Sequence, residues 1–374
     1  MPKSIISFLK KYGDISFGEK PFGAVDALIL SQFSYLKMKT IVGDLKLCSR
    51  SVTLEEFAFE LEDTVVFADT RFAKNNRCLL QEMAEGKRYK TMRLCCHVDW
   101  VDSDKQMQFS AITCILSTGS VKVVFRGTDE TLVGWREDFN MSFLYPVPGQ
   151  YFSALYLTAI AQRVSSTFDI IGHSKGGNLA VYAAMHVEDT LQERITHIYN
   201  MDGPGFRPEV YEMFGYEKIS SKIIKLIPKS SFFGMILENH HDYKVVDSRS
   251  IGILQHDPYN WIVEDDDFTY SEKLHEGRRL TNEILNLKLL SMEEAELKLF
   301  TEALFHILEA TEATTLLEFT QDIPRCMKGI AKGLHSLQPE MKNTILSFML
   351  DFIRGTRDSM VINVLDRLLE QTKQ

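Results

Sequence analysis

The chain has 374 residues, of which 45% are hydrophobic and 25% are charged, and its formal net charge is −9. This length favours one large α/β domain with an appendage, or two domains. The acidic balance argues against nucleic acid as a partner, because phosphate binding needs clustered lysine and arginine.

The first residues do not predict a secretion signal, since the apolar run from Ile5 to Leu9 is broken at Lys10 and no small-residue cleavage site follows. No stretch approaches the ~20 apolar residues of a membrane span. The six cysteines show neither a C-x-x-C pair nor disulfide-framework spacing, which favours reduced thiols and a cytoplasmic location. No phosphate-binding loop and no metal-ligand spacing occurs, so neither a cofactor nor a metal is expected.

The first part of the chain is expected to be helical. Residues 24–45 have apolar side chains at helical spacing, and residues 53–88 show no strand alternation, so both predict helices. Three β-rich runs follow at 92–102, 106–116 and 120–128, joined by short polar turns. They predict an antiparallel edge for a larger sheet.

The rest of this half alternates between strand and helix patterns. Strands are expected at 168–174, 195–202, 221–228 and 242–248, and helices at 149–165, 175–187 and 207–217. This alternation predicts a mixed, mostly parallel sheet with helices on both faces.

From about Ser271 the strand signals vanish, and apolar stripes predict four or five helices, including segments at 291–310, 343–353 and 359–371. We therefore expect an α/β domain over 1–268, with a helical segment at 1–90, and an α-helical C-terminal region over 269–374. That region is either a bundle or a cover over the sheet. The acidic run 264–267 reads as a solvated loop before it.

The stretch DIIGHSKGGNLAVYAAM, residues 169–185, carries the chemistry. Gly172, Ser174 and Gly176 form a G-x-S-x-G pattern between an apolar strand and a helix, which predicts a serine nucleophile on a tight turn. Glycines suit this turn because strand and helix pass too close for side chains. The alternative is a glycine-rich turn in a protein that binds a ligand without chemistry.

Lys175 follows the candidate nucleophile, and its backbone N–H is expected to contribute to an oxyanion hole at the helix N-terminus. Any residue except proline can supply that group. The lysine side chain is expected to point to solvent, pair with an acid or meet a polar or anionic substrate group.

A second motif, VVFRGTDETLVGWREDF at 123–139, resembles the F-R-G-T…W…D segment of the class 3 lipases, an α/β-hydrolase family. The turn with the candidate nucleophile, GHSKGGNLA at 172–180, is called the elbow below. It is similar to that family's G-H-S-L-G-G-A-L-A, with Lys175 as the main departure. With GDISF, DGPGF and QHDPYNW, the chain resembles an uncharacterised bacterial family of lipase-like hydrolases over roughly residues 12–265. The resemblance implies an α/β-hydrolase fold and an oxyanion role for Thr128.

Such a serine needs a general base, and this fold places its histidine late in the chain. His256, in ILQHDPYNW after the last expected strand, is the candidate, and lipase-like families carry a late histidine near a tryptophan. His197 falls inside an expected strand and reads as structural, while His240 and His241 fall in a polar loop. The alternative for His256 is a surface-loop histidine.

The acid is harder to assign. In class 3 lipases it follows the next-to-last strand, but here that loop, 227–235, holds Ser230 and Ser231 and no carboxylate. Asp202, one strand earlier in NMDGPGF, resembles the acid in the L-D-P-A-G-P stretch of pancreatic-type lipases and is the candidate. Its alternative is a turn aspartate that bonds its own backbone. Asp247 and Asp257 are further candidates.

These residues predict a serine hydrolase that cleaves an acyl ester through an acyl-enzyme. A small-molecule or lipid acyl substrate is expected, and peripheral contact with a membrane is left open. The apolar segment 141–151 and the helical C-terminus are candidates for a lid or acyl pocket. Two alternatives remain: a non-catalytic binding or scaffold protein on a hydrolase fold, and an acyltransferase, which shares the acyl-enzyme.

Overall fold

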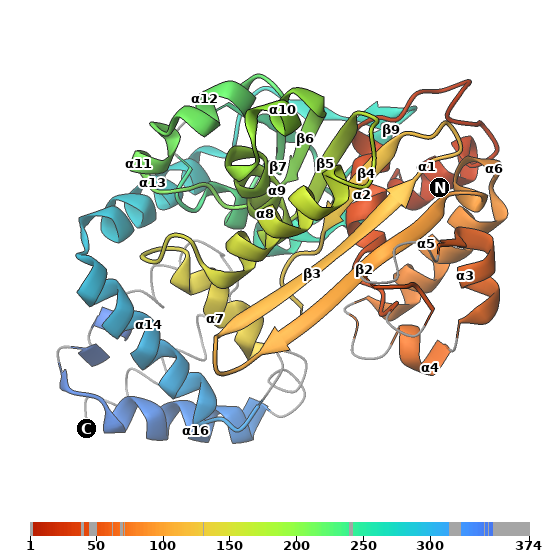
Figure 1. The fold of residues 1–374 in the computed structure, drawn as a ribbon. Helices are drawn as coiled ribbons and strands as arrows, with labels where there is room; N and C mark the ends of the chain where they lie inside the picture. The colour runs from red at the N-terminus through yellow and green to blue at the C-terminus, as the bar shows by residue number, and fades with distance from the viewer. Residues whose placement is uncertain are drawn as a thin grey trace.

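The computed structural model describes residues 3–38, 41–44, 51–61, 63–67, 70, 72–129, 131–238, 242–313, 323–339, 341–342 and 344–346. Within them a nine-stranded sheet has the order β1-β2-β3-β4-β5-β6-β7-β8-β11 (Figure 1). The strands are Val52–Thr53 (β1), Arg93–Asp102 (β2), Met107–Ile115 (β3), Val121–Phe125 (β4), Phe168–His173 (β5), Ile195–Met201 (β6), Ile223–Pro228 (β7), Lys244–Val246 (β8) and Tyr270–Ser271 (β11).

Strands β4 to β8 are parallel neighbours, and strands β1 to β4 pair antiparallel. The expected three-stranded antiparallel edge is therefore confirmed, with the short β1 added outside it. At the far end β11 pairs antiparallel with β8. This mixed sheet, with the strand–helix alternation of its centre, is the expected α/β-hydrolase fold.

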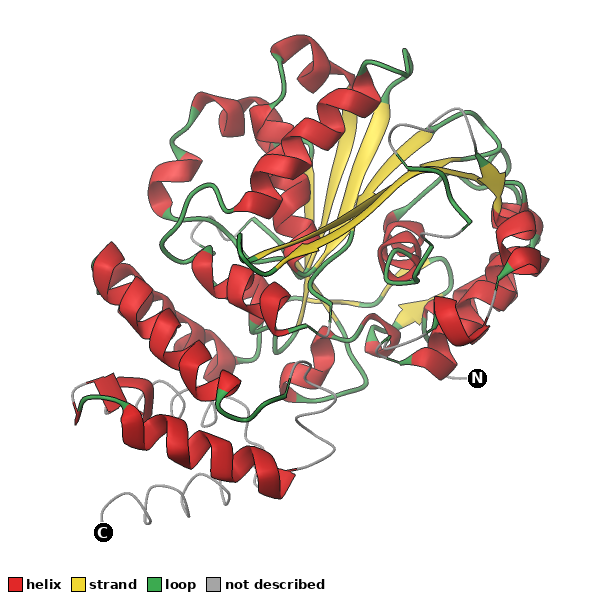
Figure 2. Ribbon diagram, turned by 60° about the horizontal axis from the view of Figure 1, so that its bottom comes forward, coloured by secondary structure: helices red, strands yellow, loops and turns green. Residues whose placement is uncertain are grey.

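Helices cover the sheet on both sides (Figure 2). They are Ile5–Tyr12 (α1), Ala24–Phe33 (α2), Leu54–Glu60 (α3), Asp63–Val66 (α4), Ala73–Glu85 (α5), Lys87–Lys90 (α6), Leu132–Asn140 (α7), Pro148–Ala161 (α8), Lys175–His186 (α9), Asp189–Arg194 (α10), Pro208–Tyr211 (α11), Phe214–Ser220 (α12), Glu276–Ser291 (α13), Glu294–Glu309 (α14) and Ile323–Ser336 (α16). Short 3₁₀ turns lie at Phe233–Met235 (η2), Gly252–His256 (η3) and Pro258–Asn260 (η4). None of these described helices is long and apolar enough to cross a membrane.

Side chains from one strand enter two different cores, because successive residues point to opposite faces of a sheet. In β5, Ile170 packs with α8 and α9, whereas Ile171 packs with α2 and the other N-terminal helices. Because both faces of the sheet are covered, every residue of β4 and β5 is buried.

Several boundaries differ from the expectations. The helix expected over 24–45 ends at Phe33, where the Ser31 and Ser34 hydroxyls bond backbone carbonyls of the last turns. The helix expected over 207–217 is two short helices, α11 and α12, separated at Glu212 and Met213.

The acidic run is not an unstructured loop. It forms a hairpin of Val263–Glu264 (β9) and Asp267–Phe268 (β10), and its exposed carboxylates pair with lysines of the N-terminal segment. The ion pairs are Lys3–Glu264, Lys11–Asp265 at 2.8 Å and Lys20–Asp266 at 2.6 Å. The four acidic residues are exposed, as expected of a solvated segment, but they form a paired hairpin and not a loop, and their lysine partners lie some 250 residues away in sequence.

The call of reduced thiols is wrong for Cys96, which is disulfide-bonded and has a positive φ of 56° in the bulged part of β2. The other described cysteines, Cys78, Cys95, Cys114 and Cys326, are free. Sequence spacing could not reveal the bond, because a disulfide depends on which backbones approach each other.

The C-terminal helices α14 and α16 pack near helix α7 of the α/β domain. Helices α14 and α16 share a small apolar cluster that also receives Trp135 and Phe139 of α7. The Phe139 and Phe305 rings meet at 5.8 Å, and Arg136 pairs with Glu309 at 3.0 Å. The expected helices over 359–371 and most of 343–353 lie outside the described residues, and the domain boundary at 268 stays a prediction.

A buried ion pair ties the N-terminal segment together. The fully buried Arg88 side chain donates to both carboxylate oxygens of Asp26, at 2.7 and 2.8 Å, and to three backbone carbonyls. Asp26 also accepts the Tyr89 hydroxyl at 2.5 Å.

The Asp26→Asn variant should lose about 3–5 kcal/mol of unfolding free energy, because it leaves the Arg88 charge buried without its partner. Urea denaturation would measure the loss. The matched control is Lys90→Ala, which breaks an exposed pair with Glu55 and should cost no more than about 1 kcal/mol. Equal losses in the two variants would contradict this account.

Candidate functional site

The candidate nucleophile lies on a sharp turn between β5 and α9. Ser174 has φ 57° and ψ −134°, a conformation that costs energy for any residue with a side chain. A Cβ on Gly172 would lie 2.1 Å from the Gly176 carbonyl, and one on Gly176 would lie 2.2 Å from the Phe125 carbonyl oxygen. The steric reason for both glycines is therefore confirmed.

His256 and Asp202 meet beside this turn. The imidazole Nδ1 is 2.6 Å from Asp202 Oδ2, although 54 residues separate the two in sequence. Because a carboxylate only accepts, Nδ1 carries the hydrogen, and the neutral ring then presents an unprotonated Nε2. Asp202 is fully buried, whereas 16% of the His256 side chain is exposed.

The loop at 227–235, which holds no carboxylate, donates a hydrogen bond to Asp202. Ser231, which follows β7, donates its hydroxyl to Asp202 Oδ1 at 2.5 Å. Both oxygens of Asp202 are thus bonded, one to a hydroxyl and one to the imidazole. Asp202 itself has φ 54°, but the bonds of its carboxylate go to Ser231 and His256 and not, as the alternative required, to the backbone of its own turn.

The other acidic and histidine candidates have different surroundings. Asp247 pairs with Lys229 at 2.6 Å and accepts from Ser271, and Asp257 accepts the Tyr259 N–H at 2.9 Å. His197 lies in β6, as expected, and faces Asp169 at 3.2 Å. The loop histidines at 240 and 241 lie outside the described residues.

Sequence reasoning missed the neighbours that fix His256. Its ring lies between His173 and Phe233, with ring centroids 4.4 Å away on each side. His173 Nε2 donates to the His256 carbonyl oxygen at 2.9 Å, since a carbonyl only accepts. In the neutral ring, its Nδ1 then accepts the Tyr35 hydroxyl at 3.3 Å. The one feature of the sequence that could have indicated a role for His173 is its position directly before Ser174.

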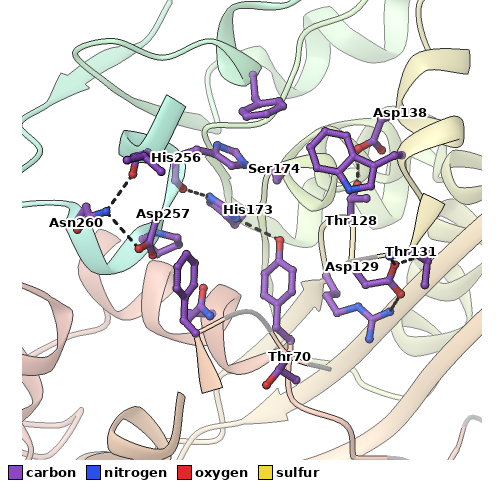
Figure 3. Close-up of a pocket in the computed structure, with 18 of the residues that line it drawn as sticks. Thr70, Thr128, Asp129, Thr131, Asp138, His173, Ser174, His256, Asp257 and Asn260 are labelled. Atoms are coloured by element: carbon purple, nitrogen blue, oxygen red, sulfur yellow. Dashed lines mark hydrogen bonds and ion pairs between the residues drawn. The ribbon is translucent and has the colours of Figure 1, made fainter. Parts of the chain in front are cut away.

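Thr128 follows β4 and lies close to the elbow. A Cβ on the preceding Gly127 would lie 2.6 Å from the His173 carbonyl oxygen and 3.0 Å from Ser174 Cβ. The Thr128 hydroxyl donates to Asp138 Oδ2 of α7. Figure 3 shows Ser174 between His256 on one side and Thr128 on the other.

Of the three expectations for the Lys175 side chain, pairing with an acid is the one observed. The side chain is fully buried, and Nζ lies 2.8 Å from Glu137 Oε2 and from two oxygens of Gln108. Glu137 also accepts the N–H groups of Gln108 and Gly149. This buried network joins the N-terminus of α9 to α7 and β3.

Ser174, His256, Thr128 and Asp138 line one cavity of about 640 Å³. Its apolar wall includes Tyr35, Phe72, Val101, Trp135, Phe233, Leu254 and Pro258. No residue of 141–151, and no described residue after 268, lines it. The described residues thus give no support to an acyl pocket at 141–151, and for the C-terminal region the expectation stays a prediction, since much of it lies outside the described residues; the α7 helix and the N-terminal segment line the cavity.

The arrangement is typical of a site for nucleophilic catalysis. A serine on a strained turn, an imidazole bonded to a buried carboxylate and a helix N-terminus converge on one cavity. This cavity lies at the carboxyl ends of the parallel strands, where ligands bind in α/β folds.

Known structures and families were compared with this chain. A solved structure titled as M37 lipase is 12% identical, with 58% of this chain and 69% of that chain covered and a TM-score of 0.36. A fungal lipase in complex with an inhibitor is 15% identical, with 66% and 85% covered and a TM-score of 0.35. None of the curated proteins matches the chain.

The model of one protein family, described as Mbeg1-like, matches residues 83–306. These residues include the β2 to β8 strands, the elbow, Asp202 and His256, and they make up more than half of the chain. The chain therefore belongs to the Mbeg1-like family.

Proposed function

We propose that this protein is a serine hydrolase that cleaves acyl esters. Ser174 is the nucleophile, His256 the general base and Asp202 the acid that orients it. Two groups stabilise the oxyanion: the backbone N–H of Lys175, and Thr128. The observation that carries the proposal is the 2.6 Å bond between His256 and the buried Asp202, beside a serine held at φ 57°.

The reaction follows from the properties of these groups. His256 Nε2 takes the hydroxyl proton as Ser174 Oγ bonds to the ester carbonyl carbon, and the carbonyl oxygen becomes negative. The tetrahedral intermediate collapses, and the imidazolium gives its proton to the leaving alcohol. Water then attacks the acyl-enzyme with the same imidazole as base, which releases the acid and restores Ser174.

Asp202 contributes through the orientation and charge of His256. Its carboxylate holds the Nδ1–H tautomer, so Nε2 is the basic nitrogen, and it stabilises the imidazolium that forms during attack. The Phe233 ring, 4.4 Å from the imidazole, also limits how the His256 ring can turn.

The cavity fits an ester with an apolar acyl part. Phe72, Val101 and Leu254 offer an apolar wall, while Asp99, Arg126 and Asp129 form a polar cluster on the same cavity. A site with both kinds of lining suits an ester that joins an acyl chain to a polar alcohol.

Ser174→Ala should reduce hydrolysis of p-nitrophenyl butyrate to the buffer rate, because the acyl-enzyme cannot form. Asp202→Asn should lower kcat by roughly 10⁴-fold, since the amide favours the wrong tautomer. The matched control is Asp247→Asn, which removes a carboxylate bonded to Lys229 and Ser271 and should keep the wild-type rate. Equal activity of the wild type and Ser174→Ala would refute the proposal.

A second test separates the backbone of Lys175 from its side chain. Lys175→Met should lose about 3–5 kcal/mol of unfolding free energy, because Glu137 is left charged and buried. The double variant Lys175→Met/Glu137→Gln should regain much of this stability and keep most of the wild-type kcat, since the N–H after Ser174 remains. Thermal melts and esterase assays on the same samples measure both. A stable double variant without activity would show that the ammonium itself takes part in catalysis.

A further inference from the structure

One wall of the cavity is a cluster of three charged side chains: Asp99 of β2, Arg126 directly after β4, and Asp129. The terminal nitrogens of Arg126 donate to both oxygens of Asp99, at 2.9 and 3.2 Å, and to Asp129 at 3.3 Å. The Arg126 side chain is only 4% exposed, whereas Asp99 is 19% and Asp129 24% exposed. The exposed part of this wall is therefore mainly carboxylate, and the guanidinium is buried and already bonded.

This cluster carries one cation and two acids, and the rest of the cavity does not cancel the excess of negative charge. The other charged residues that line it, apart from the histidines, are Lys37, Asp138 and Asp257. If Asp138 is left out because Lys175 Nζ lies 3.9 Å from it, three acids still stand against two cations among the described lining residues. A substrate in the cavity therefore meets a net negative wall.

The charged cluster lies close to the candidate nucleophile. Gly127 stands between Arg126 and Thr128, and a Cβ on it would lie 3.0 Å from Ser174 Cβ. Asp129 is two residues from Gly127, a length of chain that spans at most about 7 Å. Figure 3 shows Asp129 on the same side of Ser174 as Thr128. A charge at this range acts on a bound substrate, because the partly buried wall is screened less than an open surface.

Apolar surface adjoins the two acids. Val101 follows Asp99 by two residues in a regular stretch of β2, so both side chains lie on the same face of the strand. Val101 is 49% exposed and lines the cavity, as do the aromatic side chains of Tyr35 and Phe72. Carboxylates beside apolar and aromatic side chains suit an alkylated ammonium group, which combines a positive charge with apolar methyl groups. An anionic group would be repelled by the same wall.

We propose that the polar alcohol of the substrate carries a positive charge, and that Asp99 and Asp129 select it. This inference rests on the proposed function and names its substrate class: an ester of an apolar acid with an ammonium-bearing alcohol. The reaction is the hydrolysis described above. The ester C–O bond breaks, the leaving oxygen takes its proton from the imidazolium, and the charge of the ammonium group does not change. Arg126 holds the two acids together by offsetting their mutual repulsion.

The test uses three butyrate esters of similar size: butyrylcholine, its uncharged isostere 3,3-dimethylbutyl butyrate, and the anionic 2-sulfoethyl butyrate. The readout is Ser174-dependent kcat/KM near neutral pH, with butyrate measured by chromatography. Each value is divided by the rate constant of the same ester with hydroxide, which corrects for the reactivity of the alcohol. The ratio of two esters in one sample does not depend on the amount of folded enzyme, so variants of low stability remain informative.

The wild type should prefer butyrylcholine to its isostere roughly fivefold to thirtyfold, the effect of one net charge about 8 Å away at an effective dielectric constant of about 20–40. The sulfoethyl ester should be the poorest substrate. Raising the salt from about 20 to about 500 mM should lower the preference, because the charges are partly exposed.

The variants should move this preference in opposite directions. Asp99→Asn and Asp129→Asn should each lower it at least about threefold, since each removes one negative charge, and either serves if the other does not fold. Arg126→Gln should raise it. The matched control is Asp247→Asn, which removes a carboxylate that does not line the cavity and should keep the wild-type ratio.

Three results would overturn the inference while leaving the proposed function intact. The first is equal corrected rates for the three esters, or no Ser174-dependent cleavage of any of them by a protein that cleaves p-nitrophenyl butyrate. The second is a preference for the sulfoethyl ester that Arg126→Gln abolishes, which would make the guanidinium the binding group. The third is a preference for butyrylcholine that both aspartate variants keep. Absence of Ser174-dependent hydrolysis of every ester would overturn the inference together with the proposed function.

Discussion

The site depends on the close approach of strand β5 and helix α9 at a single residue. Only a tight turn between them gives Ser174 its positive φ, and only glycine fits at positions 172 and 176. The same turn directs the N-terminus of α9 toward the cavity. The constraint extends to β4, because a Cβ on Gly176 would collide with the Phe125 carbonyl, and so it sets the place where the Thr128 loop must begin.

The carboxylate bonded to His256 comes from a different loop than the sequence comparison with class 3 lipases suggested. Asp202 follows β6, and the loop after β7 sends the Ser231 hydroxyl to it instead of a carboxylate of its own. Because β6 and β7 are parallel neighbours, their carboxyl ends lie side by side, and either can face the histidine from η3. A carboxylate after β6 and a carboxylate after β7 differ in the loop that carries the negative charge. The position of the imidazole can be the same in both arrangements.

Much of this was accessible from the sequence. Apolar runs bounded by turn residues predicted the seven longest strands, three as consecutive β-rich runs and four from the strand–helix alternation that follows. G-x-S-x-G, the late His256 and the turn aspartate Asp202 could be predicted because each follows a strand whose end is known once the topology is known. Ser174 and His256 line one cavity, and the fully buried Asp202 is bonded to His256 Nδ1.

The remainder depends on contacts between distant segments, which local pattern cannot report. The pairing of Lys175 with Glu137, the stacking of His256 between His173 and Phe233, and the Asp138 carboxylate beside Thr128 all arise from tertiary packing. The acidic run at 264–267 likewise meets lysines from the start of the chain in exposed ion pairs. Its pairing into a hairpin is a tertiary feature that a charge run does not indicate.

The most direct test of the central claim is the rate at which a fluorophosphonate probe labels Ser174, read by mass spectrometry of the peptide that contains it. If His256 activates this serine, the wild type should react about 10²-fold faster or more than His256→Ala, because general-base assistance is worth at least that factor. Labelling of Ser174 at the same rate in both proteins, or labelling only elsewhere in the chain, would contradict the account and favour a binding protein on a hydrolase fold.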